Sequence, residues 1–345
     1  APVRRTWDGL VPVPGDGRNE WAGFLAMLAL PAKVNPPEAF VGSANENNIP
    51  AGYARLDAVA RSGWAEPWRA LRLREALGAG RALTADDMAR LQHDETSLPA
   101  RALVPYLRGL PVTGALARAA LDSLGLWDHR LSAASVAAGL YVQWERALVR
   151  AVSARAVPAA ARGLVGAVPL TRVVAWVARP ELAPAGVFDD TTAATAGRAA
   201  PAHLASVPNA AAAERRAAGR DALLLRTFVE AVAELDGRFG PDLARWRYGQ
   251  ARYKHAALRH PLGALVDSAT RAAWDVGPAP RGGSGHTLNA TGGTDQQTHG
   301  ASLRLVADLA DWDASLGTNV PGQSGDPRSP HYRDLFQPWA EGRYF

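Results

Sequence analysis

The sequence contains no cysteine and only two lysines among its 345 residues. Without cysteine, this chain cannot form a disulfide, a thiolate metal site or a cysteine nucleophile. No run of 18 apolar residues occurs, which argues against a membrane-spanning helix. The opening residues, APVRRTWDG, are not those of a signal peptide. Because residue 1 is Ala rather than Met, we expect the chain to be a processed product or part of a longer polypeptide.

Common catalytic and metal-binding motifs are also missing. The eight histidines include no HExxH motif and no pair at a metal-ligand spacing. Ser284, in GGSGH, and Ser324, in GQSGD, do not fit the G-x-S-x-G nucleophile elbow, and no phosphate-binding loop occurs. His331 and Asp334 lie three residues apart, which is more typical of a surface pair than of a ligand set. The residues alone therefore reveal neither a nucleophile nor a general base.

What is present is a globular composition whose basic charge is carried by arginine. Hydrophobic residues make up 48% of the chain, enough for a substantial core in one large or two ordinary domains. The formal net charge is +5, although the only lysines are Lys33 and Lys254. Because the 33 acidic residues are interspersed and no block of like charges occurs, we expect solvated surfaces rather than a nucleic-acid-binding face.

One segment, Phe40 to Tyr53 (FVGSANENNIPAGY), is unusually rich in asparagine. Asn45, Asn47 and Asn48 fall within four positions, at the end of a strand-like run where asparagine is disfavoured. Asparagine commonly fills turns, so an ordinary turn is the default interpretation. An uncharged amide with two N–H donors also suits a site that stabilises a carbonyl oxygen as it becomes an oxyanion. Both interpretations stay open on the residues alone.

Apolar spacing and capping residues predict a largely helical middle of the chain. Thr84 and Asp87 are placed for a capping box, and Pro67 lies in the first turn of the helix before it. Helices are expected over 64–77, 84–92, 99–110, 212–235 and 246–258, with two more between 114 and 155.

A β layer is expected to return near the C-terminus. Over 301–309, every second residue is Leu or Ala, which is the period of a strand with one buried face: Leu303, Leu305, Ala307 and Leu309. The final segment predicts a helix with Ser329 at its N-cap and Pro330 at its first position. An apolar stripe supports that helix: Tyr332, Leu335, Phe336 and Trp339.

Several segments along the chain form a recognisable series. They are WDGLVPVPG from Trp7, WAGF from Trp21, NPP from Asn35, the asparagine segment, WAEPWRALR from Trp64, LQHDETS from Leu91, GASLR from Gly300, GQSG from Gly322 and SPHYRD from Ser329. Taken together, these segments resemble the penicillin acylase (penicillin amidase) family of the N-terminal nucleophile hydrolase superfamily. The resemblance is to the C-terminal half of the β subunit, and order and spacing agree from about residue 1 to 345.

The resemblance implies an α+β chain that forms part of a four-layer αββα fold with a large helical insertion. We expect a β-rich segment with the asparagine turn over 1–60, the helical insertion over 61–280, and C-terminal strands with a terminal helix over 281–345. The implied activity is hydrolysis of N-acyl amide bonds by an N-terminal serine, freed by self-cleavage, whose α-amine acts as the base. A periplasmic location is implied in the same way.

Three residues match functional positions of the family. Asn47 matches the asparagine that helps to form the oxyanion hole, although Asn45 or Asn48 could take that role instead. Arg69 matches an active-site arginine, and the alternative is a structural or cation–π contact beside Trp64 and Trp68. Asp57 matches a calcium-binding aspartate if one residue is deleted, and the alternative is a helix start or a surface carboxylate.

The resemblance also defines what this sequence does not contain. The family's catalytic serine opens the β subunit, and nothing here corresponds to it or to the backbone N–H that completes the oxyanion hole. The expected partners are therefore the α subunit, the N-terminal part of the β subunit and a small N-acyl amide substrate. The competing hypothesis is a truncated, non-catalytic acylase-like protein that acts only in subunit association.

Overall fold

The computed structural model describes residues 1–7, 11–54, 63–80, 82–189 and 208–345. The predicted calcium ligand Asp57 lies outside these ranges. Contacts divide the chain into two compact units, Ala1–Arg81 and Ala82–Phe345, and each is described by itself.

The unit Ala1–Arg81 consists mainly of irregular chain. Its described helices are η1 (Met27–Ala29), a single 3₁₀ turn, and α2 (Trp68–Leu77). One antiparallel bridge joins Pro2 to Phe24, and it is the only strand pairing among the described residues before 81. The β-rich segment over 1–60 therefore stays a prediction. Helix α2 ends at Leu77, and the N–H of the following Gly78 donates to the carbonyl oxygen of Arg74.

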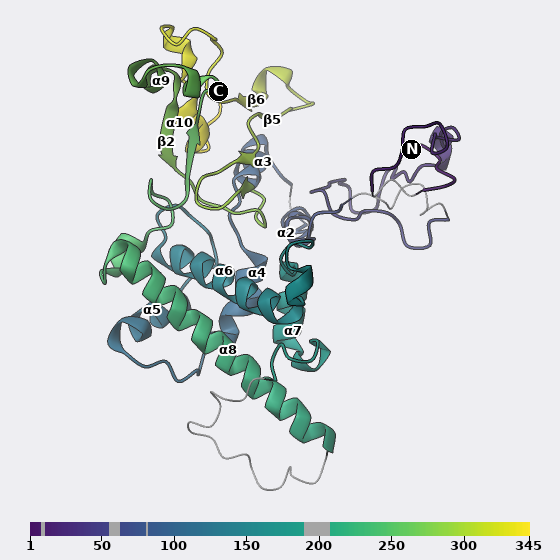
Figure 1. Ribbon diagram of the computed structural model, residues 1–345. Helices are drawn as coiled ribbons and strands as arrows, with labels where there is room; N and C mark the ends of the chain where they lie inside the picture. Colours follow the sequence, from purple (N-terminus) through teal and green to yellow (C-terminus); the bar gives the residue numbers. More distant parts are fainter. Residues whose placement is uncertain (8–10, 55–62, 81, 190–207) are drawn as a thin grey trace. The chain divides into compact units, whose positions relative to one another are not determined.

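The unit Ala82–Phe345 is built around two long helices, α6 (Val136–Ala156) and α8 (Pro208–Phe239), which pack against each other (Figure 1). Shorter helices and 3₁₀ turns pack around this pair: α4 (Leu98–Leu103), η2 (Val104–Leu107), α5 (Ala115–Gly125), α7 (Leu170–Ala178), η4 (Pro180–Leu182) and η6 (Leu243–Trp246). The unit also contains α3 (Ala85–Gln92) and η3 (Ala159–Ala161). The predicted capping box of α3 is confirmed, because Thr84 and Asp87 exchange side-chain and backbone hydrogen bonds.

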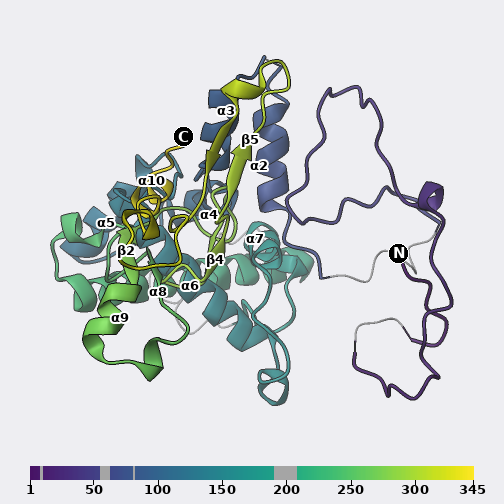
Figure 2. The same ribbon diagram turned by 90° about the horizontal axis from the view of Figure 1, so that it is seen from above.

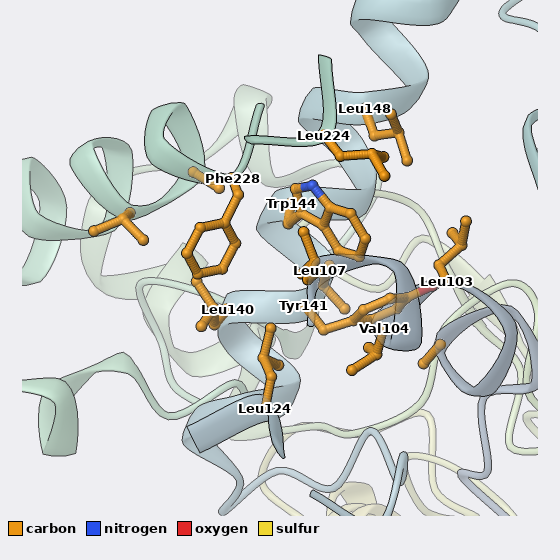
Figure 3. Packing of buried hydrophobic residues seen from close by; sticks show 14 of the residues in the cluster. Leu103, Val104, Leu107, Leu124, Leu140, Tyr141, Trp144, Leu148, Leu224 and Phe228 are labelled. Atoms are coloured by element: carbon orange, nitrogen blue, oxygen red, sulfur yellow. The ribbon is translucent and has the colours of Figure 1, made fainter. Parts of the chain in front are cut away.

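The main hydrophobic core lies between α6, α8 and the helices around them (Figure 3). Helix α6 is buried on most sides, and Tyr141 and Trp144 contribute the largest side chains to its centre. The indole Nε1 of Trp144 donates to Thr227 Oγ1 at 3.2 Å, so the polar atom of this buried ring is satisfied. The Thr227 hydroxyl in turn donates to carbonyl oxygens of its own helix.

The C-terminal part of this unit carries the strands, in three two-stranded antiparallel sheets: β1 (His255–Leu258) with β2 (Val276–Pro280), β3 (Thr291–Gly292) with β4 (His299–Gly300), and β5 (Arg304–Val306) with β6 (Leu316–Thr318). Short helices complete it: η7 (Gly263–Leu265), α9 (Ser268–Trp274), η8 (Trp312–Ala314), η9 (Pro330–Tyr332) and α10 (Phe336–Ala340). Strand β5 lies beside α3 (Figure 2).

Three of the secondary-structure predictions are wrong in part. The helix expected over 246–258 does not form: the 3₁₀ turn η6 ends at Trp246, and His255–Leu258 is strand β1, because its pairing with β2 overrides local propensity. The helix expected over 212–235 is longer: α8 continues to Phe239, and Gly240 follows it with a φ of +82°. The terminal helix is interrupted at Arg333, whose φ of −139° is not helical, although Ser329 caps the first turn as predicted.

The buried face of β5 is the reverse of the one that the alternation of leucines suggests. Arg304 and Val306 are buried, whereas Leu303 and Leu305 are largely exposed. Arg304 is accommodated because its guanidinium lies over the ring of Trp339, at 5.2 Å, and donates to the Trp339 carbonyl oxygen. A hydrophobic alternation therefore identified the strand but not the side that faces the core.

A buried lysine organises the loop between β3 and β4. Lys254 is 1% exposed, and its ammonium group donates to the carbonyl oxygens of Thr291, Gly292 and Thr294. The lysine ammonium is compact and has three donors, so it can satisfy three convergent carbonyl oxygens at once. The planar guanidinium of an arginine fits this geometry poorly. Burial is the main reason why the pKa of Lys254 falls to about 8.

Candidate functional site

The asparagine segment forms a tight turn that is fastened to the chain around α2. Asn45 adopts a left-handed backbone conformation, with a φ of +67°, which asparagine tolerates better than most residues. Its carbonyl oxygen accepts a hydrogen bond from Ala65 N at 2.8 Å. The turn and the segment leading into α2 are thus joined through the backbone.

A buried carboxylate lies at the centre of this turn. Glu46 accepts hydrogen bonds from Ala44 N at 2.7 Å and from Ser43 Oγ, and it forms a 2.8 Å ion pair with Arg74 of α2. Burial acts to raise the pKa of Glu46, but the hydrogen bonds to its carboxylate and the charge of Arg74 outweigh it and leave that pKa below its usual range. Glu46 is therefore an anion that holds the turn against the helix.

Arg69 makes a second connection between the turn and α2. Its Nη2 donates to Asn45 Oδ1 at 2.9 Å. Neither Trp64 nor Trp68 lies under its guanidinium in the described part of the chain, and Trp68 Nε1 instead donates to Glu66. Burial lowers the pKa of Arg69, but an arginine stays charged at any physiological pH. The contact with Asn45 places a positive charge beside the turn.

Asn47 is exposed, and its side chain is oriented by the backbone. Its Oδ1 accepts a hydrogen bond from Ile49 N at 3.2 Å, and this contact fixes which end of the amide is oxygen. The Nδ2 group has no hydrogen-bond acceptor among the described residues, so both of its N–H donors are available. A positioned, uncommitted amide donor is what an oxyanion hole requires.

A groove of about 1070 Å³ runs beside the turn within the same unit. Its apolar walls come from the segment before the turn and from α2, including Phe40, Val41 and Leu73. The polar residues Glu46 and Asn48 are also part of its lining, whereas Asn47 is not. Gly42 permits this packing, because a Cβ there would lie 2.8 Å from Leu73 Cδ2.

Calcium binding finds no support in the side chains that the structure describes. Calcium requires six to eight oxygen ligands, usually with several carboxylates. Within residues 1–7, 11–54, 63–80, 82–189 and 208–345, no group of three or more His, Asp or Glu side chains could hold a metal ion. Since Asp57 lies outside those ranges, the calcium site stays a prediction, and no step of the chemistry below depends on it.

Two residues of this arrangement, Glu46 and Arg74, were not singled out from the sequence. In the sequence, Glu46 looks like one more polar residue in a turn. Its burial depends on the position of α2, whose Arg74 lies 28 residues further along the chain. The available signal was weak. An acidic residue between asparagines, followed by an arginine-rich helix, indicates such a pair only when the fold is known.

The turn thus combines an oriented amide donor, Asn47, with a neighbouring arginine, Arg69. A family-wide sequence profile described as "Penicillin amidase" matches residues 1–345. The chain therefore belongs to the penicillin amidase family.

Two curated relatives show the range of that family. The chain is 29% identical over 379 residues to "Acyl-homoserine lactone acylase QuiP" of Pseudomonas aeruginosa, covering 99% of this chain and 41% of the relative. It is 31% identical over 351 residues to "Penicillin acylase 2 proenzyme" of Pseudomonas sp. strain SE83, covering 99% and 40%. The chain thus spans about two fifths of the length of the curated relatives that it matches.

Among solved structures, the chain resembles a thermostable penicillin G acylase from Alcaligenes faecalis. The TM-score is 0.53 at 17% identity, and the match covers 100% of this chain and 60% of the other. This likeness confirms the expected fold class, an α+β chain that forms part of an N-terminal nucleophile hydrolase fold. In the part of the chain that the structure describes, no helix is both long and apolar enough to cross a bilayer.

Proposed function

We propose that this chain is part of an amidohydrolase that cleaves N-acyl amide bonds and that Asn47 donates to the oxyanion of the reaction. The observation that carries the proposal is the state of the Asn47 amide. Its oxygen is held by Ile49 N, while its two N–H donors remain available in a chain of the penicillin amidase family. Both curated relatives described above are named as acylases, which supports an acyl compound as the substrate.

The proposed chemistry follows from these donors. A serine hydroxyl supplied by the remainder of the enzyme attacks the amide carbonyl and passes its proton to a base, so that the carbonyl oxygen becomes negative. Asn47 Nδ2 stabilises this oxyanion more strongly than it stabilises the neutral carbonyl, and such differential binding accelerates the reaction. The amine then leaves with a proton, and water releases the acid from the acyl-enzyme.

Arg69 acts in this proposal through Asn45 rather than on the substrate. Its contact with Asn45 Oδ1 holds the left-handed residue that begins the asparagine run. With Arg74 and Glu46, it fastens the turn to α2 at two points. The rigid turn keeps the Asn47 donors in place before the substrate arrives, so that little reorganisation is needed during the reaction.

The proposal extends to the rest of the enzyme. The serine, the base and the second oxyanion donor belong to the N-terminal part of a β subunit, which acts with an α subunit, and the location is periplasmic. These assignments, like a calcium ion at Asp57, come from the family resemblance. The proposed role of Asn47 does not depend on the calcium ion.

The complete polypeptide from which this chain derives provides the test. Release of amine should be measured with a short aromatic and a long aliphatic N-acyl amide, which also defines the acyl group. Asn47→Ala should lower kcat by about 10²–10³, or about 3–4 kcal/mol of transition-state stabilisation, with an unchanged unfolding midpoint. Asn48→Ala is the matched control and should retain most of the activity. Wild-type activity in Asn47→Ala would remove Asn47 from the mechanism.

A further inference from the structure

The hairpin β5–β6 presents a face of large apolar side chains to solvent. Leu303 is 62% exposed, Leu305 is 60% exposed and Phe345 is 72% exposed. Leu305 lies directly opposite Gly317, and opposite residues of an antiparallel pair share one face. The Phe345 ring lies 3.7 Å from the position that a Cβ on Gly317 would occupy. Leu305 and Phe345 therefore lie on the same side of the hairpin, opposite buried Arg304 and Val306.

The edges of this hairpin are already used. Gln92 Nε2 donates to the Leu305 carbonyl oxygen at 3.0 Å, on the edge of β5 that faces away from β6. On the other edge, Gly317 and Phe345 exchange two backbone hydrogen bonds, at 3.0 and 2.9 Å. Addition of another strand at either position would have to break these contacts. A partner could therefore bind to the side-chain face of the hairpin rather than to its backbone edges.

The connection between the two strands carries two more exposed apolar side chains and two acidic ones. Leu309 is 78% exposed and Trp312 is 75% exposed. Asp311 and Asp313 are exposed beside them. Single exposed apolar residues are normal on protein surfaces. Five large ones, four on one hairpin and a fifth, Phe345, that pairs with that hairpin, usually indicate a contact surface.

We propose that this hairpin face, Leu303, Leu305, Leu309, Trp312 and Phe345, is covered by the part of the acylase polypeptide that the relatives possess and this chain does not span. The length of the relatives supports this occupant, since the chain accounts for only 41% and 40% of the two described above. The covering surface is apolar where it meets the leucines, with basic groups near Asp311 and Asp313. The inference rests on family membership and does not require amide hydrolysis.

The absence of cysteine from this chain allows a direct test by chemical labelling. Leu305→Cys and the matched control Leu126→Cys, at a leucine that is 96% exposed, are each introduced into the complete polypeptide. The rate of reaction with a thiol reagent is measured for the native protein and in urea, with the parent protein as the blank. Native Leu305→Cys should react at least about 100-fold more slowly than native Leu126→Cys, and both should react alike in urea.

Each other result would overturn the proposal. Native labelling of Leu305→Cys as fast as its labelling in urea would show that the hairpin face is open in the complete protein. Slow labelling of Leu305→Cys that becomes fast on dilution, together with a dimeric mass, would show that a second copy covers the face. Because labelling does not depend on turnover, a protected but inactive protein would contradict the proposed hydrolase function and leave this inference standing.

Discussion

The two units of the chain are stabilised by different kinds of contact. Within Ala82–Phe345, a large cluster of buried apolar side chains surrounds α6 and α8. Among the described residues before 81, the buried apolar side chains are only Ala44, Trp68 and Ala70, and the asparagine turn is held by an ion pair and hydrogen bonds. The candidate chemistry therefore lies in the unit with the smaller core, where the orientation of side chains depends on a few polar contacts.

A substitution in the hydrophobic core of Ala82–Phe345 should have a large effect on stability. Leu140 is fully buried within α6, and Leu140→Ala should lower the free energy of unfolding by about 3–5 kcal/mol through lost burial and a residual cavity. Leu126→Ala, at an exposed leucine, should change it by less than about 0.5 kcal/mol. Urea unfolding of the two variants measures the difference, and similar midpoints would contradict the assignment of the core.

Glu95, in the unit Ala82–Phe345, and Glu46, in the asparagine turn, have pKa values that are shifted in opposite directions. Burial raises the pKa of Glu95 to about 7, from an ordinary value of 4.5, although Asn289 Nδ2 donates to it. Because the folded pKa is the higher one, folding favours the protonated acid. The stabilisation is fully present below pH 4.5 and is lost as the pH rises through about 7. Glu46, whose pKa is lowered, has the opposite sign.

We therefore expect Glu95 to reduce the free energy of unfolding by roughly 3 kcal/mol between about pH 4.5 and 8. Glu95→Gln keeps an oxygen acceptor for Asn289 and removes the titration. Urea unfolding of the wild type and of Glu95→Gln at both ends of this pH range isolates the contribution of Glu95. Parallel pH profiles for the two proteins would mean that Glu95 is charged in the folded state at neutral pH.

The smallest expected effect concerns the fastening of the turn. Glu46→Gln keeps an acceptor for Ala44 N but weakens the contact with Arg74, so kcat of the complete enzyme should fall about tenfold, or about 1.4 kcal/mol. The KM should change little, because Glu46 acts by positioning Asn47. Glu75→Gln alters a pair with Arg72 on the same helix and is the matched control. A pure rise in KM, or equal effects of both variants, would contradict the positioning role.

The sequence predicted local features better than long-range ones. The capping box at Thr84 and the cap at Ser329 depend on residues three or two positions apart, and both are present. Strand β1 and the buried face of β5 depend on partners far along the chain, and both were predicted incorrectly. The same limit applies to the site. The asparagines predicted the turn from the sequence alone, whereas the role of Glu46 could be recognised only once the position of α2 was known.

The use of lysine in this chain has a practical consequence for amine chemistry. Of the two lysines, Lys254 is enclosed by three carbonyl oxygens, so reagents that acylate amines are kept from it despite its lowered pKa. Lys33 is exposed, in a surface pair with Glu38, and it lines the groove beside the asparagine turn. A fluorophore or a solid support attached through lysine would therefore be confined to the wall of that groove.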